Sequence, residues 1–224
     1  MKLLFTSDIH GLISAFESFS SKLSNYDLGV IAGDLLSEDL PIDEICQLLN
    51  IEKRELPKSS IGRKDNGLVM KAMNKKEQVV KDILLRAGKP ILYVKGNHDV
   101  TEWRGTGNLY NINLRRINVG GYNFVGYQYT SLDPIGDKKL SSIEHLIDSK
   151  TILVTHAPAY GVLDYTMTVE KKMGHIGSIG IKGIVQRKKP RYHLFGHAHV
   201  ADTAVGNSIN GCYQSKYKFI RIEL

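Results

Sequence analysis

Cysteine and long apolar runs are both scarce in this sequence. Its 224 residues include only Cys46 and Cys212, too few for a disulfide framework and outside any metal-ligand spacing. No apolar run approaches the ~20 residues that a transmembrane helix needs. The apolar start at Met1–Phe5 stops at Thr6, well short of the apolar core of a signal peptide. We therefore expect reduced cysteines, no membrane association and a cytoplasmic location.

The composition is that of an ordinary globular protein. Hydrophobic residues make up 42% of the chain and charged residues 24%. A chain of this length buries a sizeable core, so we expect residues 1–224 to form a single domain. The net charge of +7 favours anionic partners. Nucleic acid, nucleotides and phosphorylated metabolites all fit this charge, and so does a basic surface that only keeps the protein in solution.

Short apolar runs alternate with helical patterns, which predicts an α/β fold. Five runs have the length and composition of buried strands: Lys2–Phe5, Leu28–Ala32, Ile91–Val94, Thr151–Val154 and Tyr192–Phe195. The amphipathic stretch Leu12–Leu23 is predicted to be a helix between the first two. Further strands are predicted at Arg116–Val119, Tyr122–Gly126 and Tyr217–Leu224, the first two paired around a Gly-Gly turn.

The segment from about residue 39 to 81 interrupts this alternation. Two helices are predicted in it, Asp43–Asn50 and Leu68–Leu85, with a polar loop around Pro57–Asn66 between them. The segment is rich in lysine and arginine and too short for a good core of its own. We interpret it as a basic helical insertion in the single domain. A solvated basic surface and a cap that guides an anionic substrate both fit this interpretation.

Each of the five predicted buried strands leads directly into a side chain that can bind a metal. In open α/β sheets ligands bind beyond the carboxyl ends of the strands, so residues far apart in the sequence can converge there. Asp8 and His10 are two residues apart after the first strand, a spacing that places both on one side of an extended chain. Asp34 follows the second strand and offers two oxygens, enough to bridge two ions. Each motif alone is also compatible with a simple turn.

The block after the third strand is more specific. In Gly96-Asn97-His98-Asp99, Asn97 supplies a neutral oxygen that limits the negative charge of the site. His98 offers an imidazole beside the metals without necessarily binding one. A turn uses Gly-Asn readily but has no need of His-Asp after it.

Histidines follow the last two predicted buried strands. His156 comes after a β-branched strand, and a buried core histidine is its simpler explanation when it is considered alone. His197 and His199 form a second pair at a spacing of two, which a turn rarely requires. A mixed set of carboxylate, amide and imidazole ligands suits Mn, Fe, Zn, Co or Ni. Together the blocks predict a metal site.

The ordered blocks resemble the signature of the calcineurin-like metallophosphoesterase family over residues 8–199, with no signature ligand missing. The resemblance implies a four-layer αββα sandwich, in which helices flank two mixed β-sheets and a dinuclear metal site lies at the carboxyl ends of the strands. It further implies two divalent ions, with manganese favoured. The first would be held by Asp8, His10, Asp34 and His199, and the second by Asp34, Asn97, His156 and His197, so that Asp34 bridges the two.

A later stretch is similar to one branch of the family, the metallophosphoesterase-domain phosphodiesterases. His156-Ala157-Pro158 leads through Gly161 and Asp164 to Gly174-His175-Ile176-Gly177-Ser178. In that branch a Gly-His-x-Gly loop approaches the site, which implies that His175 contacts the substrate. A histidine in a surface loop is the alternative. The resemblance implies an enzyme that hydrolyses a phosphate ester, preferably a phosphodiester, with a water activated by two metals.

We expect His98 to protonate the leaving oxygen or to stabilise its developing charge, and Asp99 to orient the His98 ring through a hydrogen bond. Three other functions remain open. The first is a phosphomonoesterase acting on nucleotides or phosphoproteins. The second is a nuclease, which the charge favours but the lack of aromatic residues interleaved with the basic ones does not. The third is a non-catalytic metal-binding scaffold, against which His98 and the complete set of ligands argue.

Overall fold

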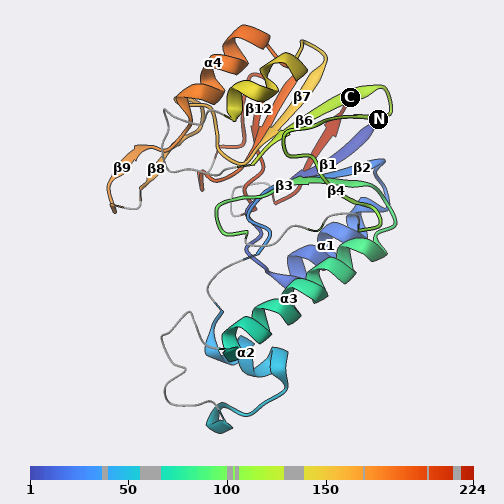
Figure 1. The fold of residues 1–224 in the computed structure, drawn as a ribbon, viewed down its shortest axis with the longest axis vertical. Coiled ribbons are helices and arrows are strands. Elements are labelled where there is room, and N and C mark those ends of the chain that lie inside the picture. Colours follow the sequence, from blue (N-terminus) through green and yellow to red (C-terminus); the bar gives the residue numbers. More distant parts are fainter. Residues whose placement is uncertain are drawn as a thin grey trace.

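Two β-sheets packed face to face form the centre of the protein (Figure 1). The structure, a computed structural model, describes residues 1–36, 40–55, 67–99, 103, 106–128, 139–168, 170–200, 202–213 and 218–224. The first sheet has the strand order β13 (Ile220–Glu223), β1 (Lys2–Thr6), β2 (Leu28–Ala32), β3 (Ile91–Val94) and β4 (Leu109–Asn111). The second has the order β11 (Ala204–Val205), β12 (Ser208–Asn210), β10 (Tyr192–Phe195), β7 (Thr151–Thr155), β6 (Tyr122–Tyr127) and β5 (Arg116–Val119).

Both sheets are mixed, with parallel strands in the middle. In the first, β1 to β4 are parallel and β13 is antiparallel to β1. In the second, β6, β7, β10 and β12 are parallel, and β5 and β11 pair antiparallel at the two edges. The carboxyl ends of the parallel strands of each sheet therefore meet along one edge, where ligand sites of open sheets form.

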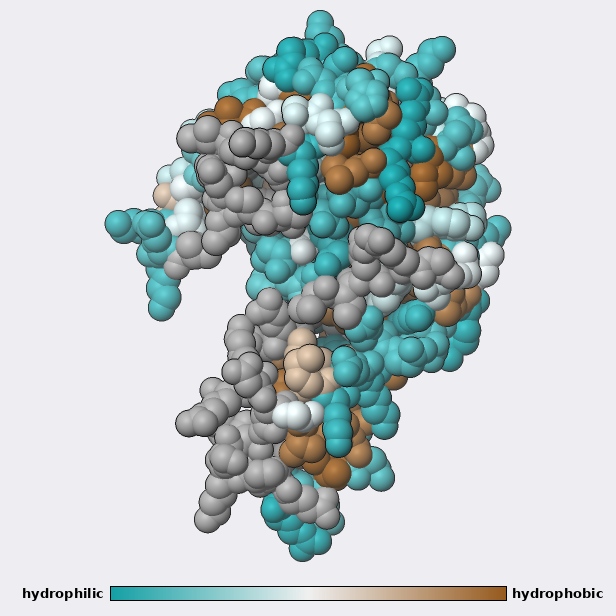
Figure 2. Space-filling model, viewed as in Figure 1, coloured by the Kyte–Doolittle hydropathy of each residue, from teal (hydrophilic) through white to brown (hydrophobic). Residues whose placement is uncertain are grey.

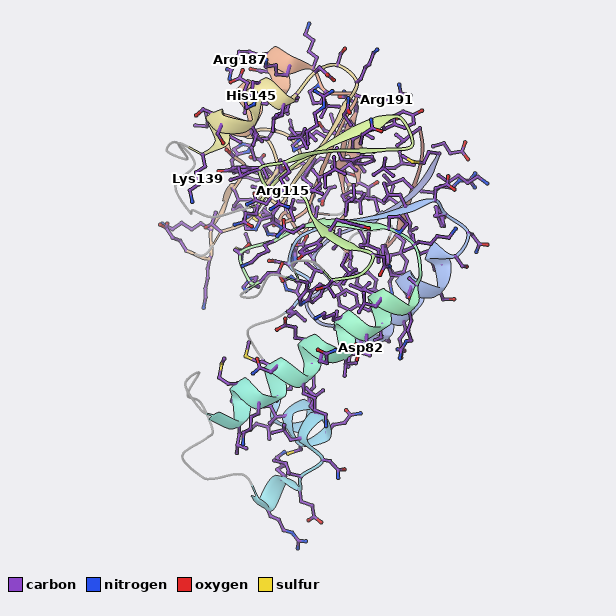
Figure 3. The ribbon with its side chains drawn as sticks, turned by 45° about the vertical axis from the view of Figure 1, so that its right-hand side comes forward. Asp82, Arg115, Lys139, His145, Arg187 and Arg191 are labelled. Carbon is purple, nitrogen blue, oxygen red and sulfur yellow. The ribbon has the colours of Figure 1, made fainter. Side chains whose placement is uncertain are left out.

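Helices cover the outer face of each sheet. On the first sheet lie α1 (Ile13–Leu23) and α3 (Gly67–Arg86), and on the second lie α4 (Ile179–Lys188) and the 3-10 helix η3 (Leu140–Leu146) (Figure 1). Arg187 of α4 donates two hydrogen bonds, of 2.8 and 3.0 Å, to Glu144 of η3 at the surface (Figure 3). The predicted four-layer sandwich with two mixed sheets is thus confirmed.

The alternation of side chains along β1 shows how the sequence builds these layers. Leu3 and Phe5 point into the core between the two sheets, together with Val154 and Leu194 of the second sheet. Leu4 points the other way, into the core shared with α1 and α3. Because both faces of the strand are buried, the run is apolar throughout instead of alternating with polar residues. This is the pattern from which the five central strands were predicted.

Most predicted elements are present within a residue or two of their expected ends. The five buried strands, the helix after β1 and the β5–β6 hairpin are confirmed, and β13 lies within the predicted final strand. Residues 214–217 and the predicted polar loop around 57–66 lie outside the described part of the chain. The two-stranded hairpin of β8 (Tyr165–Met167) and β9 (Met173–His175) was not predicted, and neither was α4.

The basic segment forms a projection that we call the arm: α2 (Ile42–Leu49), the 3-10 turn η1 (Lys53–Glu55) and residues 67–76 of α3 (Figure 1). A small core of Ile45, Leu48 and Ala72 joins α2 to α3. The second half of α3 continues into the main core, where Val80 and Leu84 are fully buried. Whether the segment is an insertion in a single domain stays a prediction. Among the described residues, no helix has the length and apolar character needed to cross a bilayer.

Candidate metal centre

The predicted ligands lie just beyond the carboxyl ends of β1, β2, β3, β7 and β10. Among the described residues, two groups of acidic and histidine side chains come close enough to hold a cation: Asp8, His10 and His199 form one, and Asp8, Asp34 and His156 form the other. Within each group the potential ligand atoms all lie within 4.8 Å of one another. The structure therefore brings together, in one cluster, side chains as far apart in the sequence as Asp8 and His199.

The first group gathers around the Asp8 carboxylate. His199 Nε2 lies 3.4 Å from Asp8 Oδ1, and the His10 and His199 rings are 5.5 Å apart. The backbone N–H of His197 donates to both oxygens of Asp8, at 3.1 and 2.9 Å. These bonds fix the carboxylate with its oxygens toward the cluster.

His156 faces an oxygen of Asp34 and one of Asn97. His156 Nδ1 lies 2.8 Å from the Ala32 carbonyl oxygen, which only accepts, so this nitrogen carries a ring proton. When the ring is neutral, as a metal ligand must be, Nε2 presents a lone pair to Asn97 Oδ1 at 2.9 Å and to Asp34 Oδ2 at 3.6 Å. These three acceptors then share no proton, and a divalent cation between them removes their mutual repulsion. The residues present thus fit a metal ion by their own chemistry.

Asp34 lies between the two groups. Its Oδ2 atom is 3.6 Å from His156 Nε2, 3.9 Å from His10 Nε2 and 4.0 Å from His98 Nε2. His197 stands at the border, with its ring 5.0 Å from that of His156. Within the described chain, neither of the two groups of ligand atoms includes His197.

Four of the predicted ligands have left-handed backbone conformations. The φ angles are 55° for Asp8, 52° for His10, 49° for Asp34 and 66° for His197. Such conformations are uncommon outside glycine and cost of order 1–3 kcal/mol each. They persist here because hydrogen bonds such as His10 N–H to the Asp34 carbonyl, at 3.0 Å, hold the loops in place. Four of the nine non-glycine residues described with this conformation are predicted ligands, so the conformation recurs in the loops that carry the site without being confined to them.

Gly96 and Gly196 lie where loops from different strands approach so closely that a side chain would not fit. A Cβ atom at Gly96 would collide with the side chain and backbone of Asp34, and one at Gly196 would collide with Ser7 and Asp8. The glycines before Asn97 and His197 therefore let loops from different strands meet at the cluster.

His98 lies at the mouth of the cluster, and Asp99 lies behind it. The His98 side chain is 42% exposed, its backbone N–H donates to Asp34 Oδ1 at 2.9 Å, and its ring lies 5.4 Å from that of His10. The Asp99 carboxylate accepts from the backbone N–H groups of Gly96 and Leu36, both at 2.9 Å. The expected hydrogen bond from Asp99 to the His98 ring is not formed between these described residues, because the carboxylate turns inward to the two amides.

Burial and mutual charge shift the proton affinities of the cluster. Burial, opposed by neighbouring His156, raises the pKa of Asp34 to about 6. Burial would also raise the pKa of Asp8, but the hydrogen bond to His199 and nearby histidines together bring it well below its usual value. The same bond raises the pKa of His199 to about 10, while burial lowers that of His10 to about 4 and that of His197 to about 3. Without a cation, a proton on His199 offsets the charge of Asp8.

One feature of the surroundings has no signal in the motifs. The Cys212 side chain hydrogen-bonds His199, although nothing near Cys212 in the sequence suggests a role in the site. His175 does not enter the metal cluster: it lies on β9, with its Nδ1 atom 2.7 Å from a carboxylate oxygen of Asp164. Asp164 lies 11 residues before His175, within the stretch that resembles the phosphodiesterase branch, but the resemblance does not predict the contact between them.

Comparisons with known proteins agree on the kind of protein that carries this cluster. A family model described as calcineurin-like phosphoesterase matches residues 1–201. Metallophosphoesterase domain-containing protein 1 of Homo sapiens and that of Mus musculus are each 39% identical to this chain over 67 residues, which is 30% of this chain and 20% of either relative. The matched segment thus spans about a fifth of the length of these curated relatives.

Solved structures share the fold at low sequence identity. The structure of TT1561 of Thermus thermophilus has a TM-score of 0.55 at 15% identity, over 96% of this chain and 89% of that one. Purple acid phosphatase PPD1 from yellow lupin seeds (Lupinus luteus) has a TM-score of 0.52 at 14% identity, over 96% of this chain and 44% of that one. At such identities the likeness extends to the fold alone.

Proposed function

This chain belongs to the calcineurin-like phosphoesterase family, and from that premise we propose that it hydrolyses a phosphate ester, preferably a phosphodiester, at the cluster around Asp8 and Asp34. The observation that carries the proposal is the convergence of acceptor atoms in two groups that share the Asp8 carboxylate. The preference for a diester is supported by the resemblance of the stretch from His156 to Ser178 to the phosphodiesterase branch.

The donor set supports two divalent ions. We propose Asp8, His10 and His199 for one ion and Asn97, His156 and His197 for the other, with Asp34 shared. The position of Asp34 Oδ2 between His10 and His156 supports the shared role. Nitrogen and oxygen ligands of this mixture suit manganese, which we favour, as well as Fe, Zn, Co and Ni. When bound, such a pair of ions supplies an activated water and offsets charge on the phosphoryl oxygens.

His98 is the proposed general acid. Its backbone is tied to Asp34, so the ring stands at the mouth of the site with much of its edge in solvent. From there it can reach the leaving oxygen of a phosphate ester and give it a proton, a contribution typically worth about 10² to 10⁴ in rate. Asp99 is proposed as a positioning residue that acts through the backbone, because it joins the loop after β2 to the loop after β3.

His175 is proposed to contact the substrate from outside the metal cluster. It follows His156 in the same connection between β7 and α4, and its ring is held by Asp164. A cytoplasmic location, a guiding role for the arm and the binding of nucleic acid stay predictions.

The test is a pair of hydrolysis rates. Protein stripped with EDTA and then supplied with manganese, iron, zinc, cobalt or nickel in turn is assayed on bis(4-nitrophenyl) phosphate and on 4-nitrophenyl phosphate, which share a leaving group. We expect turnover that requires the metal and is faster on the diester. A faster rate on the monoester would overturn the preference for diesters. A lack of turnover with each of the five metals would overturn the phosphoesterase itself.

A further inference from the structure

The β8–β9 hairpin presents an exposed aromatic and apolar face. Tyr165 pairs with His175 and Met167 with Met173, so these four side chains lie on the same face of the two strands. Tyr165 is 54% exposed, Met167 59% and Met173 53%. Large apolar side chains gathered on a small hairpin indicate a surface that contacts something apolar.

The His175 ring on this face is held in place by the buried carboxylate of Asp164. Asp164 is 1% exposed, and its second oxygen accepts from the backbone N–H groups of Gly161 and Gly177, at 3.0 and 3.1 Å. A carboxylate only accepts, so the bond from His175 places a ring proton on Nδ1. The Nε2 edge of a ring that is 40% exposed then points away from the support. Three hydrogen-bond donors therefore fix the Asp164 carboxylate, which in turn fixes the position of the His175 ring.

Tyr160 extends the face into a continuous set of rings. The centre of the Tyr160 ring lies 4.9 Å from that of His175, and the centre of the Tyr165 ring lies 5.1 Å from it. Lys182 places its ammonium group 5.3 Å from the Tyr160 ring centre. We call Tyr160, Tyr165 and His175 the aromatic rim. It combines π faces, a hydrogen-bonding ring edge and a nearby positive charge.

The aromatic rim is tied to the candidate metal centre by a short stretch of chain. Tyr160 is four residues after His156, so their Cα atoms are at most about 14 Å apart. The Ser178 N–H bonds the Pro158 carbonyl at 2.9 Å and the Tyr160 N–H bonds the Ser178 carbonyl at 3.0 Å, which fixes both ends of the hairpin segment. The hairpin leaves from the edge where β7 ends (Figure 1), and the surface is hollowed between its tip and the arm (Figure 2).

We propose that the aromatic rim binds the nucleobase of a nucleoside phosphate ester whose phosphate lies at the metal centre. This inference rests on the proposed phosphoesterase function and names its substrate class. A purine or pyrimidine stacks on tyrosine and imidazole faces, because every base has a π face. The exposed Nε2 edge of His175 forms a hydrogen bond with the edge of the base. The phosphate of the same ligand extends toward His156 at the metal centre.

Binding tests the proposal without any turnover. Adenosine 5′-monophosphate and ribose 5-phosphate carry the same phosphate, but only the first has a base. Their dissociation constants are measured by NMR titration of the full chain loaded with zinc, an ion that suits the donor set and is diamagnetic. Stacking on one aromatic ring is worth about 5- to 150-fold in affinity, so we expect adenosine monophosphate to bind tighter by at least the lower figure.

Variants of Tyr165 test whether this difference in affinity arises at the aromatic rim. Tyr165→Ala should bring the two affinities together, and Tyr165→Phe should keep them apart because the ring remains. Tyr110→Ala is the matched control, since it removes a 46% exposed tyrosine from β4. Equal affinities in the wild type, including no binding of either ligand, would overturn the proposal. So would a difference that survives Tyr165→Ala, as expected if the hairpin serves instead to dock a protein.

A kinetic arm separates this inference from the proposed function. The adenosine 5′ and methyl esters of 4-nitrophenyl phosphate share a leaving group, and the ratio of their kcat/KM values measures recognition of the base. We expect the ratio to fall in Tyr165→Ala and to keep its wild-type value in Tyr110→Ala. Turnover of the methyl ester with an unchanged ratio in Tyr165→Ala overturns the nucleobase site alone. Turnover of neither ester overturns the phosphoesterase.

Discussion

Replacing His193 with glutamine is expected to flatten the dependence of stability on pH. His193 is fully buried on β10. The Thr155 hydroxyl gives its single proton to the Ala157 carbonyl at 2.5 Å, so the His193 Nε2–H donates to the Thr155 oxygen at 2.8 Å. The Nδ1 atom is then a bare acceptor, without a hydrogen-bond partner among the described residues. In the part of the chain that the structure describes, no charged group acts on the ring to compensate a positive charge.

The sign and size of the effect follow from this environment. Burial lowers the pKa of His193 to about 3, whereas an unfolded chain binds the same proton near pH 6.5. The unfolded state therefore binds more protons between these values, and the folded state loses stability as the pH falls from 6.5 toward 3. Between pH 7 and pH 5 this one group removes about 2 kcal/mol from the free energy of unfolding.

The assay is urea unfolding at pH 7 and pH 5, with EDTA present so that metal binding does not contribute. His193→Gln keeps an amide donor for Thr155 but cannot titrate. The loss of stability between the two pH values should therefore be smaller in this variant than in the wild type by about 2 kcal/mol. Other histidines titrate alike in both proteins, so they cancel in the comparison.

The matched control is His145→Gln, because His145 lies exposed on η3 in the outer layer (Figure 3). The substitution is the same but removes an exposed imidazole instead of a buried one, so the pH dependence should stay as in the wild type. If His193→Gln loses as much stability between pH 7 and pH 5 as the wild type does, the argument from burial is refuted.

Three further predictions concern the metal centre. His98→Ala should slow hydrolysis of a diester with a poor leaving group by about 10² to 10⁴, with less effect on a nitrophenyl ester and no change in bound metal by elemental analysis; equal losses on both esters would contradict a general acid. Lys76 is 5% exposed, bonds Glu44 at 2.7 Å and packs against the glycine after His10. Lys76→Met should therefore destabilise the arm by about 1.5–3 kcal/mol in hydrogen exchange and weaken metal binding, whereas Lys75→Met, on the exposed face of α3, should do neither. Because hydrogen bonding to Asp8 raises the pKa of His199 to about 10, metal binding at pH 7 should release a proton from it; uptake without proton release from a weakly buffered solution would refute that assignment.

The central strands and the residues that follow them could be predicted from the sequence because each depends only on its own short stretch of chain. A strand buried on both faces is a continuous apolar run, and the residue after it stands at the sheet edge whatever the rest of the chain does. For this reason Asp8, Asp34 and His156 could be located from single runs. Their mutual distances could not, since these depend on left-handed turns and on contacts between loops such as that of Gly96 with Asp34.

The elements that were missed depend on tertiary contacts. The α4 helix contains Gly180 and Gly183, which lower its intrinsic helix propensity, and it is stabilised by burying Ile181 and Ile184 against the second sheet. A local signal at its start is Ser178, whose hydroxyl accepts from the Ile181 N–H at 3.2 Å as an N-terminal cap.

Side-chain direction was the other missing information. Adjacency of His98 and Asp99 suggested a hydrogen bond between them, but the carboxylate bonds two backbone amides instead. Neighbours in a chain do not fix where their side chains point, so the partner of each side chain had to come from the folded structure.

The most direct test is the electron paramagnetic resonance spectrum of metal-free protein titrated with manganese to two equivalents. If Asp34 is shared between two ions, the spectrum at two equivalents is that of an exchange-coupled pair, and Asp34→Ala abolishes it. Spectra of isolated ions throughout the titration, or no bound manganese at all, would contradict a dinuclear centre.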